Sequence, residues 1–235
     1  MMEKTDCRLI VFAKAPVPGQ VKTRLIPALG PEAAASLHEE LVFHSLATAV
    51  SAGVGPVDLW CMPSPDHPFF TRCTREFQVE LHTQLGEDIG QRMAHAFKET
   101  LKMTKRALLM GSDSPVLTCA DLREADHLLQ QNTDAVIIPA EDGGYVLIGL
   151  HHYTPELFQG VFWGTDLVLK QTRIRLRRLG WFWRELPKRW DVDRPEDVER
   201  LKSEGPIHLV SPQRILGSPV REDDHEVIPY DQDNN

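Results

Sequence analysis

The feature that most constrains the fold is a regular alternation of short apolar, β-rich runs with longer segments of helical periodicity. Seven runs predict strands, at residues 8–13, 57–62, 79–83, 106–110, 135–139, 145–150 and 181–186. Between them, apolar residues repeat at helical spacing, as at Met93, Phe97 and Leu101. Strands alternating with helices form right-handed crossovers, so we expect an α/β fold, with a mainly parallel, doubly wound sheet and helices on both faces.

The length of the chain predicts one domain. With 235 residues, of which 42 % are hydrophobic, it can bury a full core without disulfides or metal staples. We expect this domain at residues 1–205. Residues 206–235 contain repeated prolines and polar runs without periodicity, so we expect an extended or disordered tail there.

Charge and cysteine usage exclude several functional classes. The formal net charge of -8 argues against a nucleic-acid partner, which would require clustered positive charge. The four cysteines show no spacing typical of zinc sites or disulfide frameworks. No apolar run near the N-terminus is long enough for a signal peptide or a membrane span. We therefore expect a soluble cytoplasmic protein with no membrane partner.

The stretch VFAKAPVPGQVKTRL follows the first predicted strand and resembles a phosphate-binding loop. It is not a Walker A motif, because Gly19 stands three positions before Lys22 and the prolines remove backbone donors. It still brings Lys14, Lys22 and Arg24 to the carboxyl end of a strand, where they could bind a diphosphate. The alternative is an ordinary solvated turn with surface charges.

Three further stretches place polar groups or glycines after predicted strands. In RALLMGSDSPVL, Asp113 follows an apolar strand and suits a Mg²⁺ shared with phosphates; the alternative is an Asx turn. In PAEDGGYVLIGL, Gly143 and Gly144 form a tight turn or allow a ligand to approach the backbone. In WDVDRPEDVERL, Asp193 either caps the final helix or binds the metal.

These motifs, in this order, resemble the nucleotide-diphospho-sugar transferases of the glycosyltransferase-A type. The motifs that carry the resemblance are FAKAPVPGQVKTRL, QLGEDIGQRM, GSDSPVL, DGGYVLIGL, WGTDLVLKQT and DVDRPEDV. They are most similar to the group of arsenosugar-biosynthesis glycosyltransferases, also called radical-SAM/selenodomain-associated transferases. The chain is more distantly similar to phospholactate guanylyltransferase and the molybdenum-cofactor guanylyltransferase. The resemblance implies a single-domain, Rossmann-like fold over about residues 8–201.

The resemblance also implies roles for individual residues. Asp113, Lys22 and Asp193 would be catalytic, and Asp113 and Asp193 would hold Mg²⁺ or Mn²⁺. The residues that would bind the nucleotide are Lys14, Gly19, Lys22, Arg24, Gln84, Gly86, Asp88 and Arg92. On the acceptor side would lie Gly143, Gly144, Trp163 and Asp166. The structural alternatives are a plain loop and helix start at Gln84 to Asp88, a packed Trp163, and Asp166 as a helix cap.

The implied reaction is a metal-dependent transfer from a nucleotide-activated donor to a small-molecule acceptor. We favour glycosyl transfer from a nucleoside-diphosphate sugar, because the most similar group carries that name. The alternatives are nucleotidyl transfer from a nucleoside triphosphate and a non-catalytic nucleotide-binding module. The base, the sugar, the acceptor and the oligomeric state do not follow from the sequence.

Overall fold

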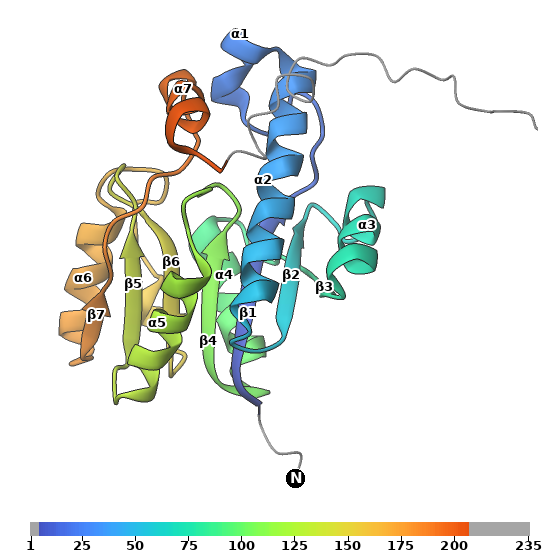
Figure 1. Cartoon of the computed structure of the whole chain (residues 1–235). Helices are drawn as coiled ribbons and strands as arrows, with labels where there is room; N and C mark the ends of the chain where they lie inside the picture. Colours follow the sequence, from blue (N-terminus) through green and yellow to red (C-terminus); the bar gives the residue numbers. More distant parts are fainter. Residues whose placement is uncertain (1–4, 207–235) are drawn as a thin grey trace, which may run out of the picture.

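The structure, a computed structural model, describes residues 5–206 and contains one seven-stranded sheet (Figure 1). The strands are β1 Thr5–Lys14, β2 Val57–Met62, β3 Glu80–Thr83, β4 Thr104–Gly111, β5 Ala135–Pro139, β6 Tyr145–Leu150 and β7 Trp183–Glu185. Their order across the sheet is β3-β2-β1-β4-β6-β5-β7. Among these strands, β6 runs antiparallel to both neighbours and the remaining pairs are parallel. The expected α/β class with a mainly parallel sheet is confirmed.

Helices cover both faces of the sheet. They are α1 Ile26–Leu29, α2 Pro31–Ala52, α3 Pro68–Phe77, α4 Ile89–Thr100, α5 Cys119–Gln130, α6 Val168–Arg178 and α7 Pro195–Glu204, with short 3-10 turns η1 Thr23–Leu25 and η2 Pro155–Leu157. α2, α3 and α5 pack on one face and α4 and α6 on the other. The expected tail at 206–235 lies outside the described residues except for Pro206, so the domain boundary stays a prediction.

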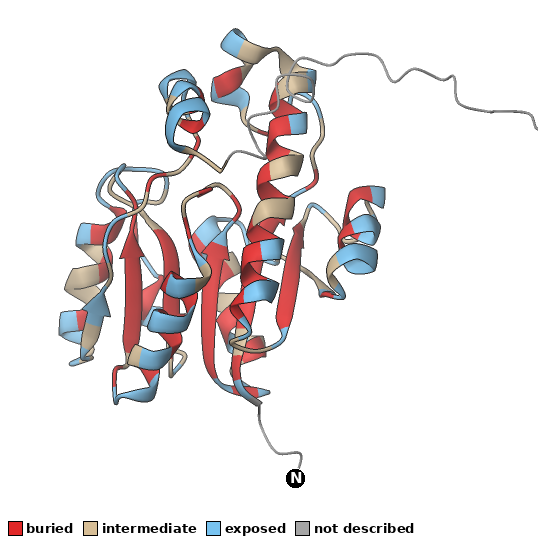
Figure 2. Ribbon diagram, viewed as in Figure 1, coloured by how far each residue is buried: buried red, intermediate tan, exposed pale blue. Residues whose placement is uncertain are grey.

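The two faces of β1 illustrate how the sequence builds these layers. Leu9 and Val11 belong to the core cluster under α2, α3 and α5, whereas Ile10 and Phe12 belong to the cluster under α4 and α6. This alternation follows from the two-residue period of a strand, and both faces are apolar because both are covered. Figure 2 shows the result as a continuous buried layer along the central strands.

A third apolar cluster lies beyond the carboxyl ends of the parallel strands. It joins α1 and α2 to the segment that leads into α7, through Leu37, Leu41, Trp190, Val192 and Leu201 among others. In Figure 1, α1 and α7 accordingly lie above the upper edge of the sheet. This cluster holds the C-terminal segment against the loop after β1, which positions the groups described next.

Three of the seven strands have the predicted bounds, and the other four differ from them by one to three residues at an end. β1 starts at Thr5 instead of residue 8, because Thr5 pairs with Thr104 and Cys7 with Arg106 on β4. β7 is shorter than the predicted run and comprises Trp183–Glu185. Such ends depend on cross-strand partners that are distant in sequence, and local periodicity does not report them.

Candidate functional site

Lys22 follows β1 in a loop that contains two prolines. Its backbone is left-handed (φ 47°, ψ 40°), a conformation that costs a residue other than glycine about 1–3 kcal/mol. Its side chain is only 5 % exposed, and Nζ lies 2.6 Å from Oδ1 of Asp113. The same Nζ donates a hydrogen bond to the carbonyl oxygen of Val192 (2.6 Å). The alternative of an ordinary surface lysine is therefore excluded.

The loop after β4 is fixed to the segment before α7. The amide of Val192 donates to the carbonyl oxygen of Asp113 (2.9 Å), and the hydroxyl of Ser114 donates to the carbonyl oxygen of Trp190 (2.8 Å). The side chain of Asp113 remains 49 % exposed. Burial alone would raise the pKa of Asp113, but the charge of Lys22 outweighs it, and the pKa lies below its ordinary value. The pair contributes stability above about pH 4 that is lost as the pH falls through this lowered pKa.

Asp193 forms an ion pair with Arg24, and it does not cap α7. Arg194 occupies the N-cap position. The carboxylate of Asp197 accepts hydrogen bonds from the backbone amides of Asp193 (2.9 Å) and Arg194 (2.7 Å). The cap hypothesis for Asp193 is therefore wrong, because Arg194 is the N-cap and the carboxylate of Asp197, the third helical residue, accepts from the amide of this N-cap residue. The carboxylate of Asp193 is left for Arg24 and for ligands.

Substitutions of Asp197 and Asp193 should separate folding from function. Asp197→Ala should lower the free energy of unfolding by about 0.5–2 kcal/mol, because two amides lose their acceptor. If Asp193 is a metal ligand, Asp193→Ser should cost little stability but lower turnover, because a hydroxyl does not replace a carboxylate beside a divalent cation. Urea denaturation and steady-state kinetics of both variants test this. A fully active Asp193→Ser enzyme would remove Asp193 from the site.

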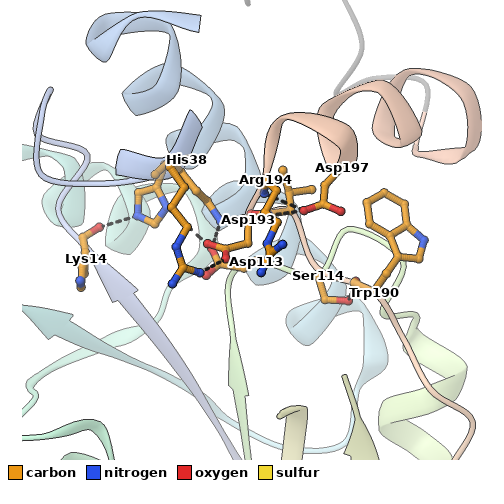
Figure 3. Close-up of polar contacts among 11 residues, drawn as sticks. Lys14, His38, Asp113, Ser114, Trp190, Asp193, Arg194 and Asp197 are labelled. Atoms are coloured by element: carbon orange, nitrogen blue, oxygen red, sulfur yellow. Dashed lines mark hydrogen bonds and ion pairs between the residues drawn. The ribbon is translucent and has the colours of Figure 1, made fainter. Parts of the chain in front are cut away.

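Both ion pairs line one cavity at the carboxyl edge of the sheet. Figure 3 shows Asp113 and Asp193, the acidic residues of the two pairs, with their polar contacts. The volume of the cavity is about 340 Å³, and its lining residues are Lys14, Gln20, Val21, Lys22, Thr23, Arg24, His38, Ser112, Asp113 and Asp193. Three of these side chains are basic and two are acidic. The cavity therefore has a local excess of positive charge in a chain with a net charge of -8.

His38 is a lining residue that sequence reasoning missed. It lies on α2 and is buried, with Nε2 3.0 Å from the carbonyl oxygen of Lys14 and Nδ1 3.9 Å from Oδ1 of Asp113. Because the carbonyl can only accept, Nε2 carries the proton, and Nδ1 is a bare acceptor without a hydrogen-bond partner. Burial lowers the pKa of His38, which favours this neutral form. A histidine within a helix gives no local signal of such a position.

Asp191 is a second residue whose environment the sequence did not reveal. Burial, followed by the charges of Asp142 and Asp113, raises its pKa to about 7. It lines a neighbouring cavity of about 560 Å³ together with Arg24, Asp142, Asp166 and Asp193. Several carboxylates thus lie close enough together that ionising all of them at once is unfavourable.

Removing the charge of Asp191 should stabilise the metal-free protein at high pH. The folded-state pKa is raised, so ionisation of Asp191 costs stability progressively from about pH 4 to pH 7. Asp191→Asn should therefore gain about 4 kcal/mol at pH 8 and almost nothing at pH 4. Thermal unfolding in the presence of a chelator at both pH values measures this. A gain that is equal at the two pH values would contradict the assigned cause.

Two of the four predicted acceptor-side residues border a third cavity, of about 270 Å³. Gly144 and Trp163 line it together with Arg24 and apolar side chains, whereas Asp166 lines the cavity that contains Asp191. Gly143 has φ +94°, and a Cβ there would lie 2.4 Å from the backbone oxygen of Asp166. Gly143 therefore allows the turn after β5 to pack directly on the loop before α6. Arg24 borders all three cavities.

The predicted base-pocket residues are engaged in contacts within the protein, several of them with backbone carbonyl oxygens. The amide of Gln84 donates to the carbonyl oxygens of Ala13 (3.2 Å) and Trp60 (2.8 Å). Asp88 is the N-cap of α4, and Arg92 Nε donates to the carbonyl oxygen of Gly86 (3.0 Å). Gly19 lies in the turn before Gln20, with φ +80°. The cavities described above are not lined by these residues, and a nucleotide-binding role for them stays a prediction.

No helix within residues 5–206 combines the length and the apolar character needed to cross a membrane. Residues 45–165 match the family described as "Uncharacterized protein conserved in bacteria (DUF2064)". The chain belongs to this family. The matched part of this DUF2064 member contains Asp113, the Gly143 turn and Trp163, and it leaves Lys22, Arg24 and Asp193 outside. No curated protein matches the sequence.

Solved structures share the fold of this DUF2064 protein. A crystal structure from Desulfovibrio desulfuricans G20, provisionally assigned as a nucleotide-diphospho-sugar transferase, is 33 % identical with a TM-score of 0.74, covering 81 % of this chain and 83 % of that one. A nucleotidyl transferase from Methanothermobacter thermautotrophicus is 11 % identical with a TM-score of 0.57, covering 87 % and 98 % of the two chains.

A third similar structure contains ligands. Glucosyl-3-phosphoglycerate synthase from Mycobacterium tuberculosis, in complex with Mn²⁺, UDP and glucosyl-3-phosphoglycerate, is 11 % identical with a TM-score of 0.53, covering 92 % of this chain and 81 % of that one. At this identity the likeness concerns the fold alone. The expected glycosyltransferase-A-like, Rossmann-like fold of the DUF2064 member is confirmed, and the resemblance to the arsenosugar and guanylyltransferase groups stays a prediction.

Proposed function

We propose that this protein is a metal-dependent transferase that acts on a nucleotide-activated donor, and we favour glycosyl transfer from a nucleoside-diphosphate sugar. The observation that carries this proposal is the cavity in which Lys22, Arg24, Asp113 and Asp193 meet at the carboxyl edge of the sheet. Ligands of open α/β sheets bind at this edge. The 33 % identical structure assigned provisionally to nucleotide-diphospho-sugar transferases supports the same class.

The oxygen-only donor set of Asp113 and Asp193 fits a hard divalent cation. Both carboxylates line the same cavity, where carboxylate oxygens could meet a divalent cation together with phosphate oxygens. Asp113 and Asp193 would hold Mg²⁺ or Mn²⁺ there. Such a cation, when bound, neutralises charge that develops on the phosphate oxygens of a leaving group. The similar synthase from Mycobacterium tuberculosis was solved with Mn²⁺ and UDP.

The basic residues of the cavity would bind the diphosphate. Lys22 presents a fixed point charge, because its backbone and its two contacts hold Nζ in place. Arg24 is exposed and offers several donors that could bind two phosphate oxygens. Lys14 stands at the end of β1 on the same cavity wall. These charges would stabilise the departing nucleoside diphosphate through interactions that strengthen as its negative charge develops.

The acceptor would bind on the Trp163 side of Arg24. That cavity is lined by Phe12, Met93, Tyr145 and Trp163 around the backbone of Gly144, so it combines apolar walls with a few polar groups. Asp142 borders both this cavity and the one that contains Asp191. A carboxylate in that place could accept the proton of an attacking hydroxyl group. The acceptor in this proposal is a small molecule, and the protein works in the cytoplasm.

Nucleotidyl transfer is the second candidate, and the likeness in fold to a nucleotidyl transferase favours keeping it. The two reactions use the same cations and carboxylates but differ in the bond that breaks. Glycosyl transfer breaks the bond between the sugar and the β-phosphate and releases a nucleoside diphosphate. Nucleotidyl transfer breaks the bond between the α- and β-phosphates and releases pyrophosphate.

A ligand screen followed by product analysis tests the proposal. Nucleoside triphosphates and nucleoside-diphosphate sugars are added with and without Mg²⁺ or Mn²⁺, and thermal stability is recorded; a ligand at 100 times its Kd adds about 2.7 kcal/mol. The best donor is then incubated with enzyme, and its slow hydrolysis is followed by chromatography. We expect nucleoside diphosphate as the product. Release of pyrophosphate would establish the second candidate, and absence of metal-dependent stabilisation by any nucleotide would reject both.

A further inference from the structure

A group of charged and metal-ligating side chains lies away from the cavity of the ion pairs, on the outer strands β2 and β3. Asp58 and Glu80 are direct cross-strand partners, and His82 follows two residues later on the same face of β3. Across the other edge of β2, Asp58 pairs with Ile10 of β1. Ile10 stands four residues before Lys14, the last residue of β1. At about 3.3 Å per residue, the group therefore lies ~13 Å from the carboxyl edge. It takes no part in the proposed transfer.

Two atoms of this group are buried without a hydrogen-bond partner. The side chain of Asp58 is only 1 % exposed, and its Oδ2 lacks a donor; His82 Nε2 is likewise buried and unpaired. These atoms lie 3.7 Å apart, which is too long for a hydrogen bond. Buried polar groups are normally satisfied, and an unsatisfied carboxylate oxygen is costly. A cation placed between these two atoms would give each of them a partner.

The imidazole of His82 is held toward the carboxylates by its packing. Its ring stacks on the indole of Trp60, with the centroids 4.9 Å apart and the planes at 20°. Trp60 is itself buried and packs edge-on against His95. His82 Nε2 lies 3.9 Å from Oε2 of Glu80. The nitrogen thus faces both carboxylates from a rigid platform.

The spacing of these three groups suits a small divalent cation. One ligand atom from each of Asp58, Glu80 and His82 lies within 4.8 Å of the other two. Ligands of a tetrahedral zinc ion are about 3.3 Å apart, since the bonds are about 2.0–2.1 Å long. Glu80 is 68 % exposed, so its side chain can close the remaining distance and offers a path from solvent.

Arg8 neutralises only part of the negative charge. Its Nη1 donates to Oδ1 of Asp58 (2.6 Å) and to Oε2 of Glu80 (3.3 Å), which leaves Oδ2 of Asp58 unpaired. With Arg8 cationic and His82 neutral, the formal charge of the group is -1. A divalent cation would fill the position that Arg8 does not reach.

We propose that Asp58, Glu80 and His82 form a metal site of their own, with one imidazole and two carboxylate ligands and water completing a four-coordinate shell. The imidazole selects a zinc-like transition ion over Mg²⁺, which prefers oxygen ligands in octahedral geometry. The chain would then hold two cations of different chemistry at separate places. The ion between β2 and β3 would fasten the edge strand β3 to the sheet.

Zinc titration of the untagged, chelator-treated full chain tests the proposal. Isothermal titration calorimetry should show one equivalent of Zn²⁺ bound by the wild type, and Co²⁺ should give the intense visible absorption of a four-coordinate complex. His82→Gln and Glu80→Gln should each weaken Zn²⁺ binding at least about tenfold. Zn²⁺ should also raise the Tm of the wild type and leave that of His82→Gln unchanged.

Two controls make the result specific. His152→Gln removes an exposed histidine elsewhere, and Asp113→Asn removes a carboxylate of the ion-pair cavity; both should retain wild-type affinity for Zn²⁺. Because Glu80 is exposed, Glu80→Gln keeps the test decisive if His82→Gln fails to fold. Equal Zn²⁺ affinity in the wild type and Glu80→Gln would overturn the proposal, as would loss of the bound equivalent in Asp113→Asn. The first result would leave the transferase proposal untouched, whereas the second would place the zinc ion in the ion-pair cavity.

Discussion

Asp113→Asn is expected to lower metal-dependent turnover by about 10³-fold, because a bound cation contributes several kcal/mol of charge stabilisation in the transition state. Asparagine keeps the size of the side chain, so the loop after β4 should stay bonded to Trp190 and Val192. The buried ammonium of Lys22 loses its counter-ion and keeps only the carbonyl of Val192. We therefore expect a loss of about 1–3 kcal/mol in the free energy of unfolding. Initial rates at saturating donor and chemical denaturation measure the two effects.

Asp66→Asn is the matched control for this substitution. Asp66 is an exposed carboxylate that contacts Ser64 in the loop before α3, and it does not line the ion-pair cavity. Its substitution should change neither turnover nor the dependence on metal concentration. If Asp113→Asn keeps the turnover of Asp66→Asn, Asp113 is a structural partner of Lys22 and the metal lies elsewhere.

Lys22→Met should raise the Kd of the donor by about 10²-fold. The thioether side chain fills nearly the same space, but the charge that would meet the diphosphate is gone, and hydrogen bonds to charged groups contribute about 1.5–3 kcal/mol. Because Lys22 is buried and holds the loop after β1 to Asp113 and Val192, the variant should also lose stability. Equilibrium binding of the donor in excess metal, measured well below the Tm of the variant, isolates the effect on affinity.

Lys14→Met provides the comparison. Lys14 is an exposed residue on the wall of the same cavity, so its substitution removes an equal charge from a more hydrated position. We expect a smaller loss of affinity, since exposed charges are screened by solvent. Equal effects of the two substitutions would mean that Lys22 acts only through the overall field and does not contact the donor.

The sequence was sufficient to predict the architecture, because each strand and most helices have local periodicity. The motifs that follow strands include the stretches around Lys22 and around Asp113. They could be assigned to one edge of the sheet, because the carboxyl ends of parallel strands lie at the same edge. For Asp193 the sequence left a helix cap and a metal ligand as alternatives, and the cap is the alternative that the structure excludes. Asp193 and Asp197 both stand near the helix start, and only the backbone conformation shows that Asp197 accepts the free amides.

Residues that act through distant contacts could not be found from local patterns. His38 lies on α2 and reaches the site because α2 packs against the end of β1. Asp191 acquires its raised pKa from burial and from carboxylates on other loops. The pairing of Asp58 with Glu80 depends on the register of two parallel strands, which a crossover separates in sequence. In each case the decisive partner is far away along the chain.

In the ligand-free site, Lys22 is paired with Asp113 and Arg24 with Asp193. The protein's own charged groups therefore compete with an incoming metal ion or phosphate for the same partners. A divalent ion that arrives alone must displace a lysine or an arginine from a carboxylate. A phosphate that arrives alone must draw the same cations away from their partners. When both arrive, each takes over the groups that the other releases, so metal and nucleotide should each tighten the binding of the other by the same factor. The resting site would thus hold free divalent ions and inorganic phosphate weakly and would favour the complete metal–nucleotide complex.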